Sequence, residues 1–93
     1  MLTVFKYPLH FDDYQSISIP SGAVLLSVRM QHEIPMLWAL VDPSHSLEYR
    51  NFRMAGTGHT ISENPESLRF VDTFLVDDGL LVFHVFEVLK KGV

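Results

Sequence analysis

The sequence predicts an all-β fold, a small antiparallel β-sandwich or a partly open barrel of about six to seven strands. Short segments rich in Val, Leu, Ile and Phe recur about every 10 to 14 residues, with turn residues between them. Aromatic residues make up 12% of the chain, and side chains of these types favour strands. We find no convincing helix. With 93 residues, the chain has room for one core, so we expect a single domain over residues 1–93.

The first half of the chain predicts four strands, which are residues 2–6, 15–19, 23–31 and 36–41. Pro8 is expected to end the first strand, because proline has no amide hydrogen for a ladder. In the third strand, alternation places Val24, Leu26, Val28 and Met30 on the core face. The fourth strand is apolar on both faces and includes Trp38, which indicates a central position with Trp38 either buried or part of a dimer face.

The second half predicts three more strands, which are residues 47–55, 68–76 and 80–89. Asp78-Gly79 indicates a hairpin between the last two, because both residues tolerate the positive φ of a tight turn. Residues 60–67 form a polar loop with a weak signal for one helical turn, and residues 90–93 are expected to be a solvated tail. The last strand is apolar on both faces, which need either covering loops or another subunit, so we expect a homo-oligomer.

Composition excludes several classes of function. The net charge of −4 lacks the basic character expected of a protein that binds extended nucleic acid. The absence of cysteine excludes disulfides and thiolate metal sites. The first residues show no signal-peptide pattern, and no apolar run is long enough to cross a membrane. We therefore expect a cytoplasmic protein with no membrane association, no metal and no cofactor.

One polar cluster has an evident chemical use. A strand with two arginines leads into a Gly-Thr-Gly turn followed by a histidine. Glycines let a backbone approach a ligand closely, and turn amides with arginines suit phosphate or carboxylate groups. His59 would add a hydrogen bond or stack on a base. The predicted ligand-binding residues are Arg50, Arg53, Gly56, Thr57, Gly58 and His59.

Purely structural explanations of these residues compete with a ligand-binding role. Arg50 and Arg53 point to opposite sides of a regular strand, and only a bulge would converge them. The two glycines alone would also form a strand-ending turn with His59 exposed. His84 lies in the most apolar strand, where a histidine is more often a core residue than a catalytic base. The other histidines lack metal-ligand spacing, and the paired His-x-Thr or His-x-Ser motifs of a phosphoesterase are absent.

Four stretches together resemble a family of small, β-rich proteins of phages and prophages with no settled function. They are Lys-Tyr-Pro-Leu at residues 6–9, Leu-Trp-Ala-Leu-Val-Asp-Pro at 37–43, Gly-Thr-Gly-His at 56–59 and Phe-His-Val-Phe-Glu at 83–87. The resemblance spans nearly the whole chain and implies no catalytic residues. The resemblance implies a phage genomic context, in which small proteins are often accessory factors that counter host defence.

We therefore expect a noncatalytic phage accessory protein that binds and sequesters a small anionic ligand, such as a nucleotide immune signal. The alternative is a protein-binding module that inhibits a host protein or serves phage assembly, using a strand edge or the region of Trp38. A nucleotide phosphodiesterase using His59 or His84 is a third hypothesis.

Overall fold

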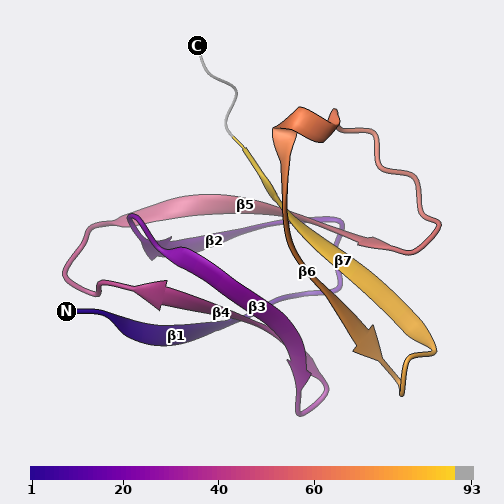
Figure 1. Cartoon of the computed structure of the whole chain (residues 1–93), viewed down its shortest axis with the longest axis horizontal. Helices are drawn as coiled ribbons and strands as arrows, with labels where there is room; N and C mark the ends of the chain where they lie inside the picture. Colours follow the sequence, from indigo (N-terminus) through magenta and orange to yellow (C-terminus); the bar gives the residue numbers. More distant parts are fainter. Residues whose placement is uncertain (90–93) are drawn as a thin grey trace.

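A computed structural model describes residues 1–89, and it confirms the all-β prediction. Seven strands form two antiparallel sheets that do not close into a barrel. Figure 1 shows the two sheets facing each other, with the three-stranded sheet in the order β1-β4-β3 and the four-stranded sheet in the order β2-β5-β7-β6. The strands are β1 (Thr3–Pro8), β2 (Tyr14–Pro20), β3 (Val24–Gln31), β4 (Ile34–Val41), β5 (Leu47–Gly56), β6 (Leu68–Val76) and β7 (Leu81–Val88).

The three-stranded sheet is built around β4, as its apolar character predicts. Pro35, Leu37, Ala39 and Val41 alternate along β4 on its buried face. Trp38 lies on the opposite face and is only half-buried, so it is not a core residue. Pro35 lies within β4, whereas Pro8 is the last residue of β1, as predicted. Pro8 pairs with Met36 at the edge of the sheet, where a missing amide hydrogen is tolerated.

The four-stranded sheet places β5 between β2 and β7. Phe52 pairs with Gln15 on one side and with Glu87 on the other, so these three side chains share the inner face. Arg53 pairs with Tyr14 and Phe86, which places it on the outer face. The register is regular through both arginines. Arg50 and Arg53 therefore lie on opposite faces of β5, as their spacing predicts.

The core fills the space between the inner faces of the two sheets. Its largest fully buried side chains come from five different strands, and they are Ile19, Val28, Leu37, Val41, Phe52 and Val85. Phe11, Phe74 and Phe83 stack at one end of the core, with ring centroids of Phe11 and Phe83 5.3 Å apart. This end of the core is where the β1–β2 connection and the β6–β7 hairpin meet.

Two β-bulges interrupt β3 and β6, and the first of them corrects the predicted faces of β3. The ladder between β3 and β4 shifts between Leu25 and Ser27, and the ladder between β6 and β7 shifts between Phe70 and Asp72. The first bulge turns Leu25 inward with Val28 and leaves Val24 and Leu26 exposed. The prediction that Val24 and Leu26 belong to the core is therefore wrong, because alternation cannot be extended through an extra residue.

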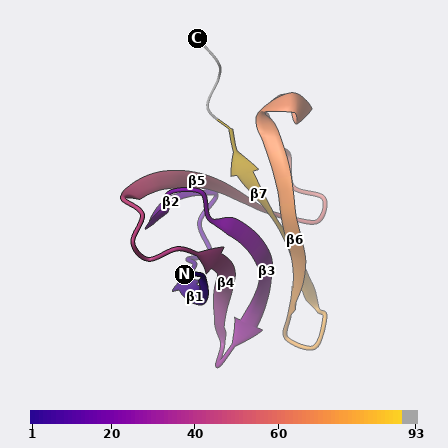
Figure 2. The ribbon, with the colours of Figure 1, turned by 60° about the vertical axis from the view of Figure 1, so that its left-hand side comes forward.

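The bulged strands β3 and β6 lie beside each other and join the two sheets. Figure 2 shows β6 running alongside β3, each at the edge of its own sheet. Backbone pairing does not continue across this seam. Instead, the Val28 amide donates a 2.9 Å hydrogen bond to Oδ2 of Asp72. A side-chain hydrogen bond thus takes the place of backbone pairing between β3 and β6, the edge strands at which the two sheets meet.

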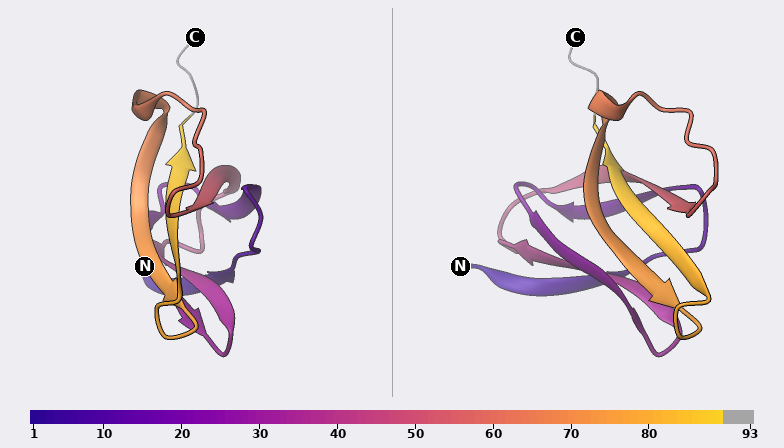
Figure 3. Two further views of the ribbon diagram at one scale, coloured as in Figure 1. Left: turned by 90° about the vertical axis from the view of Figure 1, so that its right-hand side faces the viewer. Right: turned by 45° about the vertical axis from the view of Figure 1, so that its right-hand side comes forward.

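Two hairpin turns extend beyond the sheets at one end of the molecule. His32 and Glu33 of the β3–β4 turn have φ of 50° and 67°, and Asp77 and Asp78 of the β6–β7 turn have φ of 52° and 55°. The two tips lie near each other in both views of Figure 3. In the loop between β5 and β6, the predicted helical turn corresponds to one 3₁₀ turn, η1 (Pro65–Ser67). The predicted tail at 90–93 lies outside the described residues.

Candidate functional site

Arg50, the first residue of the predicted anion site, is part of a buried ion pair. Its Nε and Nη2 donate to the two carboxylate oxygens of Glu87 at 2.6 and 2.8 Å, and Nη1 donates to the Ala23 carbonyl at 2.6 Å. The pKa of Arg50 is raised, chiefly by the hydrogen bonds to Glu87. Because all three nitrogens have partners and only 14% of the side chain is exposed, Arg50 offers little to a ligand.

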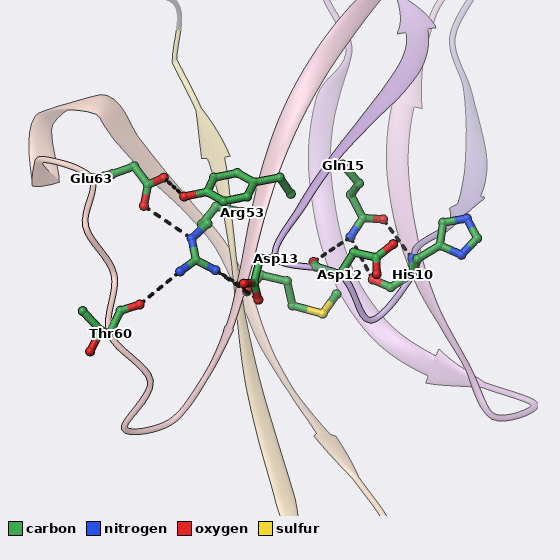
Figure 4. A network of polar contacts seen from close by, with 9 residues as sticks. His10, Asp12, Asp13, Gln15, Arg53, Thr60 and Glu63 are labelled. Carbon is green, nitrogen blue, oxygen red and sulfur yellow. Dashed lines mark hydrogen bonds and ion pairs between the residues drawn. The ribbon is translucent and has the colours of Figure 1, made fainter.

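Arg53 forms a second network on the outer face of the same strand. Its Nε donates to Oε1 of Glu63 at 3.3 Å, and its two terminal nitrogens donate to the carbonyls of Met54 and Thr60 at 2.6 and 3.1 Å. The guanidinium lies 4.9 Å from the centre of the Tyr14 ring. Figure 4 shows these contacts converging on one side chain. Arg53 therefore anchors the loop that follows β5.

Glu63 is held as a carboxylate by the same network. The Tyr14 hydroxyl donates to its Oε2, and Arg53 donates to its Oε1. The hydrogen bond from Tyr14 is the main cause that lowers the pKa of Glu63, and the Arg53 charge acts in the same direction. A paired carboxylate at this position fixes the loop across the outer face of β5.

The Gly-Thr-Gly-His turn uses its amides internally. The Thr57 amide donates to the Val82 carbonyl at 3.1 Å, and the His59 amide donates to the Gly56 carbonyl at 3.0 Å. Gly58 has φ of 87°, a conformation that other residues rarely adopt. An anion nest needs several free amides pointing to one place. Two of the amides at 57–59 are committed within the chain, so the turn is built mainly to close the β5–β7 end.

His84 connects three segments on the outer face of the sheet. Its Nε2 lies 2.7 Å from the Thr57 hydroxyl, and its Nδ1 lies 2.9 Å from the Thr73 hydroxyl. Both ring nitrogens are thus occupied by hydroxyl groups, from the glycine turn and from β6. His84 is half-buried on this face and is not a core residue, although both of its ring nitrogens have partners.

A pocket of about 360 Å³ lies beside the glycine turn at the aromatic end of the core. Its floor is apolar, formed mainly by Met54, Val76 and Phe83. Asp12 and Asp13 line it from the connection between β1 and β2, and His59 lines it from the turn after β5. The volume is in the range of small-molecule sites, and an apolar floor with a few polar groups is typical of them.

Gly56 determines where His59 sits on this pocket. A Cβ atom added to Gly56 would lie 2.9 Å from Cε1 and 3.0 Å from Nδ1 of His59. The imidazole therefore packs directly on the glycine, in space that any other residue would fill. This close approach, rather than an unusual φ, explains why glycine suits position 56.

The structure divides the predicted site residues between separate locations. Gly56 and His59 line the pocket, whereas Arg50 and Arg53 lie on opposite faces of β5, each in its own network. Sequence reasoning missed the remaining pocket residues. In the sequence, Asp12 and Asp13 are typical turn residues, and the aromatic ring of Phe11 beside them is the one unusual feature of this polar connection. Val76, Leu81 and Phe83 cannot be distinguished from other strand residues by pattern.

Among residues 1–89, no group of three or more His, Asp or Glu side chains is arranged to hold a metal ion. In the same part of the chain, no helix is long and apolar enough to span a membrane.

These features define a two-sheet antiparallel β protein with a small pocket at one open end and with Arg50 and Arg53 in internal networks. The chain belongs to the family described as a domain of unknown function, DUF7352, whose model matches residues 1–92. No curated protein matches the chain. No solved structure matches it either.

Proposed function

We propose that this protein is a noncatalytic binding protein and that the pocket beside His59 is its ligand site. The observation that supports this most directly is the lining of the pocket. It combines an apolar and aromatic floor with two carboxylates and one imidazole. Such a lining suits a flat, largely apolar group that carries N–H donors, as the base of a nucleoside or nucleotide does.

Each wall of the pocket would recognise a different part of such a ligand. Phe11 and Phe83 offer ring surfaces for a planar group. The carboxylates of Asp12 and Asp13 accept hydrogen bonds, and a carboxylate paired with an N–H donor gives a strong, directional contact. His59 adds another ring or a hydrogen bond from the turn after β5. The same carboxylates would repel a phosphate, so the base rather than the phosphate is the recognised part.

A binding role without turnover is supported by the absence of any hydroxyl, thiol or amine among the lining residues. The two carboxylates and His59 are the ionisable groups present, so the mass of the bound ligand decides between binding and turnover. Retention of an unchanged ligand is the outcome that sequestration requires. The resemblance to phage proteins supports the wider proposal that the protein is an accessory factor that lowers the free concentration of a nucleotide signal in a host cell.

Native mass spectrometry combined with calorimetric titration tests this function. The protein is incubated with nucleosides and with their 5′-phosphates, and the bound mass and affinity are measured. We expect an unchanged nucleoside to be retained, with the phosphorylated form binding no more tightly. Much tighter binding of the phosphorylated form would support the anion site predicted from the sequence instead. A changed ligand mass would indicate an enzyme, and the absence of any binding would contradict the proposal.

Two substitutions locate the binding at this pocket. Asp12→Asn removes one carboxylate charge and should weaken binding by about 1.5 to 3 kcal/mol, the usual contribution of a hydrogen bond to a charged group. His59→Ala should weaken it as well. His10→Ala is the matched control, because His10 is an exposed loop histidine outside the pocket lining. Equal losses of affinity in His59→Ala and His10→Ala would show that the pocket is not the ligand site.

A further inference from the structure

The outer face of the three-stranded sheet is apolar and faces solvent. Strand register places Val4, Leu40 and Val24 in one row across the sheet, with Trp38, Met36 and Ile34 following along β4. Val4, Val24 and Ile34 are exposed, and the other three are half-buried. We call these six residues the Trp38 face. Tryptophan and methionine are enriched where proteins associate, and apolar patches of this kind mark interaction sites.

Two cations lie on the Trp38 face without an acidic partner. Lys6 pairs in register with Trp38, and Arg29 pairs with Met36. Arg50, Arg53 and Arg69 all lie next to carboxylates, whereas neither Lys6 nor Arg29 forms an ion pair within residues 1–89. Lys6 donates instead to the Gln31 side chain at 2.6 Å, across the sheet. In a chain with a net charge of −4, this face therefore stands out as basic and apolar.

The β6–β7 hairpin tip has the complementary properties. Asp77 and Asp78 are exposed at the tip, and Leu80 and Leu81 follow them with 84% and 49% of their surface exposed. Figure 3 shows this hairpin reaching past the sheets at one end of the molecule. We call residues 77–81 the acidic tip. It presents two carboxylates and two leucines at the end of a two-stranded hairpin. The carboxylates complement the two cations of the Trp38 face, and the leucines complement its apolar side chains.

We propose that the acidic tip of one copy of this chain docks on the Trp38 face of a second copy. Leu80 and Leu81 would cover Trp38 and Met36, while the carboxylates of Asp77 and Asp78 would approach Lys6 and Arg29. Charge complementarity selects this pairing over face-to-face contact. Two Trp38 faces brought together would oppose their cations, and like charges across an interface disfavour it.

Docking of a tip on a face gives a particular kind of assembly. The two surfaces are different, so after one contact has formed, one molecule keeps a free face and the other keeps a free tip. Such a heterologous contact continues into rings or chains of molecules, unlike a two-fold dimer. The mass of the assembly should therefore increase with concentration beyond that of a dimer.

Sedimentation equilibrium tests the proposal with purified protein from about 1 μM to about 1 mM, a range that covers weak and moderate association. The wild type should show a mass that rises past two subunits at moderate salt and falls when salt screens the charges. A wild type that stays monomeric throughout would overturn the proposal, and so would a dimer that grows no further.

Two variants separate the two surfaces. The face variant, Lys6→Glu with Arg29→Glu, makes the face acidic. The tip variant, Asp77→Asn with Asp78→Asn and Leu80→Ser, removes the charges and one leucine while keeping residues that tolerate positive φ. Each variant alone should raise the dissociation constant by at least about thirtyfold, the effect of losing one central contact residue. A control, Glu66→Gln with Leu47→Ser, removes one carboxylate charge and one exposed leucine elsewhere and should assemble as the wild type does.

Mixing the two variants gives the decisive result. The intact tip of the face variant should bind the intact face of the tip variant, and no further contact is available to either partner. The mixture should therefore stop at a heterodimer, whereas each variant alone is a monomer. No complex in the mixture, although both variants melt as folded proteins, would overturn the proposal. Continued assembly of either variant alone would do the same.

Discussion

Asp72 and Val28 join the two sheets of this protein by a hydrogen bond between a side chain and a backbone amide. Oδ2 of Asp72 accepts from the Val28 amide at 2.9 Å, and Oδ1 accepts from the Thr73 amide at 2.8 Å. Both ends of the contact lie just after a β-bulge. One carboxylate thus satisfies a buried amide at the seam where neither sheet continues.

We expect Asp72→Ala to lower the free energy of unfolding by about 1 to 3 kcal/mol, because the Val28 amide would lose its only partner in a buried position. Val28 is fully buried, so water would not readily replace the carboxylate. Urea unfolding followed by tryptophan fluorescence measures the change. Glu66→Ala, in the exposed 3₁₀ turn, serves as the control. A stability of Asp72→Ala equal to that of the control would contradict a structural role for this contact.

The same seam shows why the sequence predicted the strands better than their faces. Alternating apolar residues and turn signals were sufficient to locate seven strands, because each depends on local chemistry. The bulge at residues 25–27 has no local marker, so Val24 and Leu26 could not be placed outside the core. Their exposure depends on the pairing of β3 with β4.

The candidate site was predictable only in part, for a related reason. Gly56 and His59 were found because glycine and histidine are conspicuous in a turn. The partner of Arg50 is Glu87, 37 positions away in the chain, and no local pattern connects them. An arginine with an undetected carboxylate partner resembles an arginine that awaits a ligand. Only the fold distinguishes the two.

Substitutions in the β3–β4 turn should increase the stability of the protein. His32 and Glu33 both have positive φ, which a two-residue hairpin turn of this kind requires, and residues other than Gly, Asn and Asp adopt it at a cost. His32→Asn with Glu33→Gly should raise the free energy of unfolding by about 1 kcal/mol, and Tm by about 4 to 8 °C for a domain of this size. Differential scanning calorimetry provides the test. A lower Tm would show that these side chains make stabilising contacts.

Gly56→Ala should separate stability from binding. The added Cβ would displace the His59 ring, but the ring is exposed and free to rotate away. Gly56 does not have positive φ, so alanine should leave the free energy of unfolding unchanged or raise it by about 0.4 to 1 kcal/mol. Affinity for a base-containing ligand should fall as far as in His59→Ala. Unchanged affinity, with the His59 resonances shifted in NMR spectra, would show that His59 does not contact the ligand.

Acid should destabilise the protein through Asp42. Hydrogen bonds from the Ser44 hydroxyl and amide lower the pKa of Asp42 from 3.8 to about 2. Between these values the unfolded chain binds more protons than the folded protein, so stability rises with pH across this window and is lost as pH falls through it. Glu63, whose pKa is also lowered, acts in the same direction.

The measurement for this prediction is Tm at about pH 5 and about pH 2.5, at constant ionic strength. Asp42→Asn should show a smaller decrease in Tm than the wild type, because it has no carboxyl group to protonate at this position. The control is Asp12→Asn, which leaves the Asp42 and Glu63 contacts in place. An equal decrease in Tm for the wild type and Asp42→Asn would exclude Asp42 as a source of the acid sensitivity.

The buried pair of Arg50 and Glu87 should be strongly cooperative. Their side chains are 14% and 8% exposed and share two short hydrogen bonds, so removing one partner leaves the other charge buried without compensation. Arg50→Met and Glu87→Leu should each lower the free energy of unfolding by about 3 to 5 kcal/mol, whereas the double variant should lose far less than the sum. Urea unfolding of all four proteins completes the cycle. Arg69→Met, which removes the more distant cation 3.8 Å from Glu87, should cost less than about 1 kcal/mol because Arg69 is exposed. Additive losses in the double variant would show that the pair contributes little beyond the burial of its separate side chains.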